Sequence, residues 1–184
     1  MSRLPSLERH QLDAAQLKVH ESIAGLRGGV RGPFKVLLAN PELASRIEQV
    51  GAYARYQCSV PQRLRELSIL TVAAFWQADY EWSAHAPIAR ALGLEPAVIE
   101  AIGQGARPDF RDQTEKTVHD FTHQLLTRKH VTDGTFAAAK EALGAAGVLD
   151  LTGLVGYYTM LALVINVAEV EVPDDSDIPW RRQA

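Results

Sequence analysis

Residues 61–76, PQRLRELSILTVAAFW, are the stretch of sequence that decides the fold. Pro61 is typical of a helix start, and Leu64, Leu67 and Leu70 or Thr71 follow at helical spacing. Nearly every residue from Leu67 to Trp76 is apolar, so this helix is expected to be buried on most of its surface. We therefore predict a central core helix with Glu66 at its edge.

Helical periodicity continues on both sides of this stretch. Asn40 and Asp112 are suited to cap helices, and Gly93 is a typical left-handed terminator. The predicted helices cover residues 7–26, a segment from Pro41, 79–92, a segment from Asp112 through Leu126, 132–144 and 148–168. No alternating strand pattern competes with them, so the sequence predicts an all-α fold.

The 184 residues suit a single domain over 1–184, because no linker is long enough to divide it. Residues 1–30 form an N-terminal helix and a glycine-rich link, 31–172 the core and 173–184 an acidic tail. Gly25–Gly32, GLRGGVRG, fits neither phosphate-loop pattern, so we interpret it as a flexible connection. The tail is expected to lie on the surface or on a neighbouring subunit.

Composition excludes several classes of protein. The formal net charge of −3 argues against a nucleic-acid binder, and one cysteine excludes an intrachain disulfide framework or dithiol site. The N-terminal residues do not resemble a signal peptide. Residues 151–168 are uncharged, but Gly153, Gly156, Asn166 and acidic flanks favour a buried helix over a membrane span. We expect a cytoplasmic protein with neither nucleic-acid nor membrane partners.

The densest group of polar residues on an apolar background runs from Glu66 to His85. Glu81 and His85 are four residues apart and share a helical face. A carboxylate beside an imidazole fixes its tautomer and orients a proton acceptor, as general acid–base catalysis requires. The same spacing also occurs on many solvated helices, so from spacing alone both interpretations stay open.

These residues carry a family resemblance. RLRELSIL (63–70) and YEWSAHAPIARALGL (80–94) resemble the core of the carboxymuconolactone decarboxylase superfamily, which includes the alkylhydroperoxidase-D-like proteins. The resemblance extends through residues 32–34, 40–44, 156–158 and Asn166. It implies an alkylhydroperoxidase-D-like helical bundle that assembles into homo-oligomers: dimers, trimers or hexamers.

The redox branch of that family uses a Glu, then Cys-x-x-Cys, then a His. Glu66 and His85 match the Glu and His, whereas Ala78 and Glu81 stand at the two cysteine positions. Neither Ala nor Glu supplies a thiolate, so dithiol peroxidase activity is not expected.

The decarboxylase branch is cofactor-free, and similarity to it implies loss of CO2 from a small carboxylated lactone. We expect His85 to act as the acid/base, with Glu66 or Glu81 orienting it, and no cofactor or metal. Tyr53, Arg55, Tyr56 and Trp82 are the candidate substrate-binding residues. An arginine there is able to bind a substrate carboxylate.

Weaker signals leave alternatives. Glu115, His119 and His123 follow at four-residue spacing, which suits a metal site but more often marks a polar helix face. Cys58 is either a peroxide-reactive thiol or an inert small residue. The alternative functions are thus a peroxidase relative that works through Cys58, and a non-catalytic oligomeric binding protein. The identity of the substrate is not encoded in the motifs.

Overall fold

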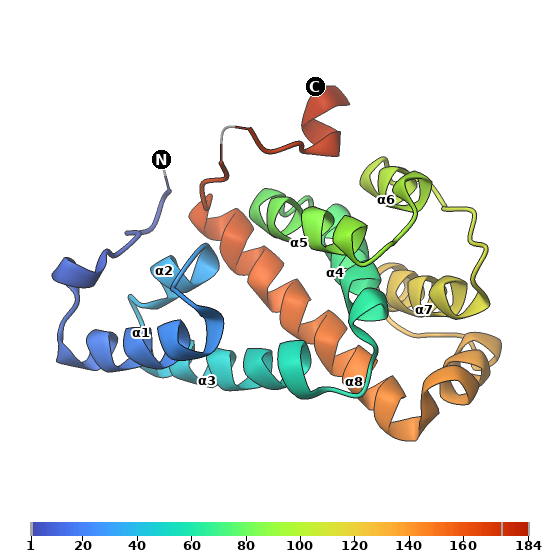
Figure 1. Cartoon of the computed structure of the whole chain (residues 1–184), viewed down its shortest axis with the longest axis horizontal. Helices are drawn as coiled ribbons and strands as arrows, with labels where there is room; N and C mark the ends of the chain where they lie inside the picture. Colours follow the sequence, from blue (N-terminus) through green and yellow to red (C-terminus); the bar gives the residue numbers. More distant parts are fainter. Residues whose placement is uncertain (1, 174, 184) are drawn as a thin grey trace.

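The structure, a computed structural model, describes residues 2–173 and 175–183. Within that part the chain is helical and holds no strand, so the predicted all-α fold is confirmed (Figure 1). Its helices are α1 (Ala14–Arg27), α2 (Pro33–Leu37), α3 (Pro41–Ala52), α4 (Gln62–Trp76), α5 (Asp79–Ala91), α6 (Pro96–Gly103), α7 (Gln113–Arg128) and α8 (Asp133–Ala168). Short turns are η1 (Arg9–Gln11), η2 (Tyr53–Gln57) and η3 (Pro179–Gln183).

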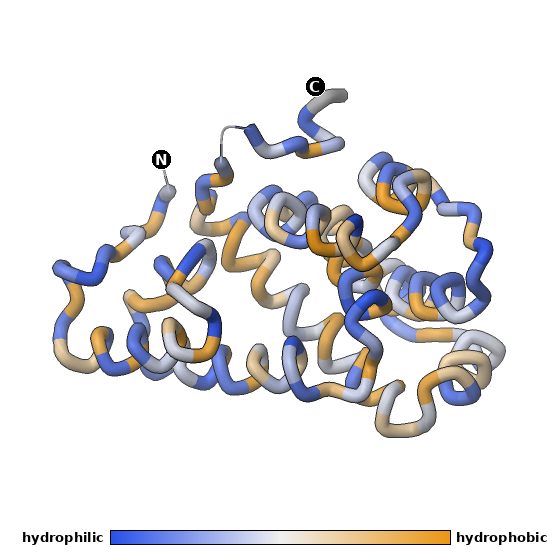
Figure 2. The backbone as a smooth tube through the Cα atoms, in the orientation of Figure 1, coloured by the Kyte–Doolittle hydropathy of each residue, from blue (hydrophilic) through white to orange (hydrophobic). Residues whose placement is uncertain are grey.

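Helix α4 lies at the centre, as its apolar sequence predicts. It packs against α5, α7 and α8, and residues on every side of it are buried, among them Leu67, Leu70 and Val72. Figure 2 shows hydrophobic segments on the helices that meet in this region. The end of α4 is fixed to α8, because Asn166 donates its side-chain amide to the Trp76 carbonyl at 2.7 Å.

Helix α8 crosses the whole molecule (Figure 1). Thr132 caps its start, and Gly144 breaks the helical dihedrals at φ 71°, which matches the two predicted helices 132–144 and 148–168. By length and composition alone α8 is able to cross a membrane, yet half of its most apolar window is buried inside the fold. That burial is what a core helix of a soluble protein shows.

The first helix begins later than predicted. Instead of a helix from residue 7, the chain forms η1 and then α1 from Ala14. Asp13 and Gln16 form a reciprocal capping box, in which each side chain accepts a hydrogen bond from the backbone N–H of the other residue. This cap stabilises a helix start at Ala14 and separates η1 from α1.

The C-terminal tail folds back on its own chain, over α5 and α6. Ile178 is buried, and Pro179 lies close to Gly103 of α6. Trp180 packs edge-on against Trp82 at 5.4 Å between ring centroids and donates its indole N–H to Asp79 at 2.6 Å. The tail therefore buttresses the start of α5 from behind.

Candidate acid–base site

Glu66 and His85 meet between α4 and α5. His85 Nδ1 and Glu66 Oε2 are 2.6 Å apart, and the two residues are only 4% and 3% exposed. The helices that carry them are joined by only Gln77 and Ala78, with Gln77 in the left-handed region at φ 49°. When Nδ1 donates to the carboxylate, Nε2 is the ring nitrogen left for a bound molecule.

A cavity of about 390 Å³ opens beside this pair. His85, Glu81 and Tyr158 belong to its wall, and the Tyr158 ring packs edge-on against the His85 imidazole at 5.3 Å. The remaining wall is largely apolar: Pro33, Phe34, Ala84, Ile88, Leu161 and Ile165. An apolar pocket with a few convergent polar groups is the usual form of a small-molecule site.

Three arginines also line the cavity: Arg27, Arg31 and Arg55. Arg27 is already engaged, since its Nε donates to buried Glu48 at 2.7 Å and its guanidinium lies over the Phe34 ring. Arg55 stacks on Tyr56 and pairs with no carboxylate among the described residues. The cavity is therefore electropositive and suits an anionic molecule.

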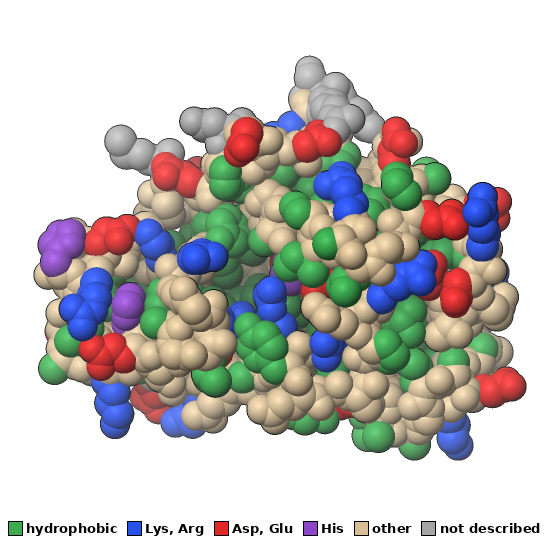
Figure 3. All heavy atoms as spheres, in the orientation of Figure 1, with side chains coloured by type: hydrophobic (Ala, Val, Ile, Leu, Met, Phe, Trp, Pro, Cys, Tyr) green, Lys and Arg blue, Asp and Glu red, His purple; other side chains and the backbone are tan. Residues whose placement is uncertain are grey.

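The glycine-rich segment forms one side of this cavity, which corrects its interpretation as a flexible connection. Helix α1 runs through Gly25 to Arg27, and Gly29 and Arg31 reach the cavity. Gly32 has φ +55°, and a Cβ there would lie 2.1 Å from the Tyr80 ring. A glycine is thus required for this segment to close over Tyr80. Figure 3 shows blue Lys and Arg side chains beside hydrophobic ones on this face of the molecule.

The two predicted orienting carboxylates behave differently. Glu66 contacts His85, whereas both oxygens of Glu81 lack a hydrogen-bond partner although Glu81 is only 3% exposed. Burial raises the pKa of the Glu81 carboxyl well above its usual range. The Glu81–His85 spacing correctly places both residues on the cavity side of α5, but Glu66 is the residue that orients the imidazole.

The predicted substrate-binding residues divide into two pairs. Arg55 and Tyr56, on the π-helical turn η2, line the cavity. Tyr53 does not; its hydroxyl donates to Asp150 at 2.7 Å. Trp82 is 1% exposed and belongs to the core, away from the cavity wall.

Several cavity residues had no signal in the sequence pattern. Arg27, Arg31 and Tyr80 lie outside any spacing rule, and Tyr158 stood out only through the family resemblance.

Cys58 lies outside this cavity. It is buried, its thiol donates to the Ala54 carbonyl at 3.1 Å, and Arg65 Nη1 lies 3.6 Å from the sulfur. Ala78, at the first of the two thiol positions in the redox pattern, is fully buried at the start of α5. The structure therefore favours Cys58 as an inert, packed residue.

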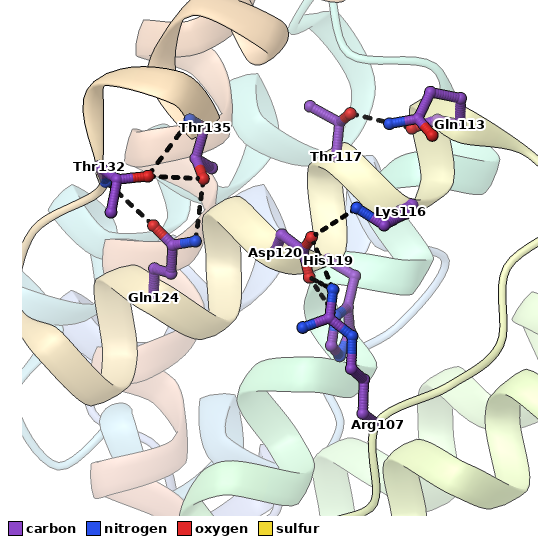
Figure 4. A network of polar contacts seen from close by, with 9 residues as sticks. All are labelled: Arg107, Gln113, Lys116, Thr117, His119, Asp120, Gln124, Thr132 and Thr135. Carbon is purple, nitrogen blue, oxygen red and sulfur yellow. Dashed lines mark hydrogen bonds and ion pairs between the residues drawn. The ribbon is translucent and has the colours of Figure 1, made fainter.

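The histidines of α7 belong to a separate polar network (Figure 4). Asp120 accepts two hydrogen bonds from Arg107 at 2.9 Å each and pairs with Lys116 at 3.2 Å. His119 is buried, stacks on His123 at 5.8 Å, and keeps its Nδ1 3.6 Å from Asp120, beyond hydrogen-bond distance. Glu115 pairs instead with Arg63, and among the described residues no group of three ligands suits a metal ion.

His119 is expected to make the fold acid-sensitive. Its burial lowers its pKa from 6.5 to about 4, so the unfolded chain takes up a proton before the folded protein does. Stability is complete above about pH 6.5 and is lost as the pH falls towards 4, by about 2 kcal/mol at pH 5. Urea unfolding at pH 7 and pH 5 measures this, and His119→Gln should flatten the loss. The exposed neighbour variant His123→Gln should keep the wild-type slope; an unchanged slope in His119→Gln would contradict the assignment.

Comparisons with known proteins agree with this picture. Residues 41–117 match the carboxymuconolactone decarboxylase family. A solved alkylhydroperoxidase AhpD core protein, a peroxidase-related protein from Ralstonia eutropha JMP134, superposes with a TM-score of 0.76 at 16% identity, over 95% of this chain and 93% of that one. The debrominase Bmp8 in complex with 2,3,4-tribromopyrrole gives 0.74 at 16% identity, over 100% and 96%. A peroxidase-related protein from Silicibacter sp. TM1040 gives 0.73 at 16% identity, over 95% and 92%. No curated protein matches the sequence closely. The fold is thus alkylhydroperoxidase-D-like.

Proposed function

Because residues 41–117 belong to the carboxymuconolactone decarboxylase family, we propose that this chain is a cofactor-independent acid–base enzyme that removes CO2 from a small carboxylated, lactone-type substrate. One observation carries the proposal: the Glu66–His85 pair, 2.6 Å apart, is buried beside a cavity that arginines line. This arrangement supplies a proton-transfer group and an anion-binding wall in one place.

The chemistry needs two things from the protein. Arg55, whose guanidinium has no carboxylate partner among the described residues, is suited to hold a substrate carboxylate. As CO2 leaves, the electron pair of the broken C–C bond is delocalised into the adjacent unsaturated lactone. His85 then delivers a proton from Nε2 to that carbon, while Glu66 stabilises the imidazolium form through Nδ1.

The direct test is CO2 release from a carboxymuconolactone-type substrate by the wild-type protein and by His85→Ala. We expect turnover by the wild type and loss of it in the variant. Equal rates in both, or none in either, would overturn the proposal. Hydrogen peroxide consumption by wild type and Cys58→Ser tests the peroxidase alternative, which requires that activity to depend on Cys58.

The cytoplasmic location and the homo-oligomeric assembly stay predictions. Several large apolar side chains on α8 are exposed in the single chain, with Leu149 at 73% and Val167 at 65%. Sedimentation of the purified protein would measure its assembly.

A further inference from the structure

Glu81 is a buried acid that the proton-transfer pair does not use. It lines the cavity beside His85, it is 3% exposed, and neither of its carboxyl oxygens has a hydrogen-bond partner. Position three of a helix usually lets a Glu reach the helix start, where it caps the backbone. Here the side chain is buried instead, and a buried polar group without a partner is unfavourable unless a bound molecule supplies one.

The charges around Glu81 do not neutralise it. Arg27, Arg31 and Arg55 line the same cavity, yet none of them donates a hydrogen bond to either Glu81 oxygen. Arg27 is committed to Glu48.

The other titratable groups nearby are the buried pair Glu66–His85 and three tyrosines. Tyr80 precedes Glu81 on α5, while Tyr157 and Tyr158 on α8 both interact electrostatically with it. None of them compensates a negative charge on Glu81, and desolvation raises its pKa well above the usual range. Glu81 is therefore a neutral carboxylic acid at neutral pH, which gives the cavity an O–H donor.

We propose that Glu81 donates this hydrogen bond to a carbonyl oxygen of the bound molecule, next to the carbon that His85 protonates. This inference rests on the proposed function and narrows its substrate class. The ligand is an anion in which the carbon that loses CO2 is conjugated to a carbonyl group. Arg55 recognises the anion and Glu81 recognises the carbonyl.

The two acids divide the reaction between them. When the C–C bond to the departing CO2 breaks, its electron pair moves into the conjugated carbonyl and forms an enolate oxygen. The Glu81 O–H hydrogen-bonds that oxygen and keeps its own proton. His85 transfers the Nε2 proton to carbon, the C=O bond reforms, and the imidazole regains a proton from water. A neutral donor in a dry site stabilises developing oxyanion charge more than water does.

The first measurement is the protonation state of Glu81. Infrared difference spectra at pH 7 between wild type and Glu81→Gln should contain the carbonyl stretch of a protonated carboxylic acid. Glu8→Gln, which changes an exposed glutamate paired with Lys35, should give no such band. If the Glu81→Gln difference also lacks it, the proposal is wrong.

The second measurement uses two ligands that do not react. We choose 5-oxotetrahydrofuran-2-carboxylate, which has a lactone carbonyl, and tetrahydrofuran-2-carboxylate, which lacks it. Titration calorimetry with the wild type should show about tenfold tighter binding of the lactone. Glu81→Gln keeps an N–H donor and should retain the preference, whereas Glu81→Leu should abolish it.

These outcomes separate the inference from the proposed function. If the lactone preference depends on Glu81 but no CO2 is released from any substrate, the carbonyl site stands and the decarboxylase proposal fails. If Glu81→Leu keeps the preference, or neither ligand binds, the inference fails whatever the activity.

Thermal unfolding checks that the Glu81 variants fold. The wild type should lose stability as the pH rises above the usual Glu range, because the unfolded chain releases the Glu81 proton first. Glu81→Gln should lack that loss, and a wild-type pH slope in this variant would contradict the neutral acid.

Discussion

Replacing Glu66 with Gln is expected to lower the rate of CO2 release by about 10²–10⁴-fold, comparable to losing the orienting carboxylate of a catalytic triad. Glu66 Oε2 lies 2.6 Å from His85 Nδ1 in a site where both residues are buried, so no water replaces the carboxylate. A Gln amide can present its NH2 group to Nδ1, which favours the wrong tautomer, and it carries no charge to stabilise an imidazolium. Steady-state rates of wild type, Glu66→Gln, His85→Asn and the double variant measure the effect.

The double variant decides whether the two residues act as a unit. If they do, the double variant should lose little more than the weaker single variant. His85→Asn is the matched choice, because its amide N–H still faces Glu66. Removing the imidazole without a replacement would leave a buried carboxylate unpaired, at a cost of about 3–5 kcal/mol. Losses that multiply would show instead that Glu66 and His85 act independently.

Replacing Trp82 with Ala is expected to lower the free energy of unfolding by about 3–5 kcal/mol. Trp82 is 1% exposed and packs against Trp180, which joins α5 to the folded-back tail. Deletion of the indole therefore leaves a cavity behind the helix that carries Glu81 and His85. Denaturant unfolding followed by circular dichroism measures the loss.

Phe75→Ala is the matched control, because Phe75 is 44% exposed. It should cost about 1 kcal/mol or less. Trp82→Phe, which stays folded, should keep the wild-type KM, since Trp82 lies outside the cavity wall. A raised KM in Trp82→Phe would instead support substrate contact, as the sequence-based prediction has it.

The predicted helix positions depend on local rules, and most of them are confirmed. Asn40, Asp112 and Thr132 each cap a helix through a side-chain oxygen that accepts a backbone N–H. Where the local rule was incomplete, the structure differs: Glu115 does not return the capping bond to Asp112 but pairs with Arg63 of α4. The pairing of a helix terminus with another helix depends on tertiary contacts, which no local pattern contains.

The sequence by itself determined that this protein is all-α, that α4 is its buried centre and that Glu81 and His85 share one face of α5. These features follow from the periodicity of apolar residues and from the 3.6-residue turn, which act over one helix at a time. Only the tertiary structure decided which carboxylate contacts His85 and which arginines reach the cavity. Glu66 is 19 positions from His85, and Arg27 and Arg55 come from other elements. Their meeting depends on how helices pack and which rotamers the packed side chains adopt, so it is settled only when the core closes.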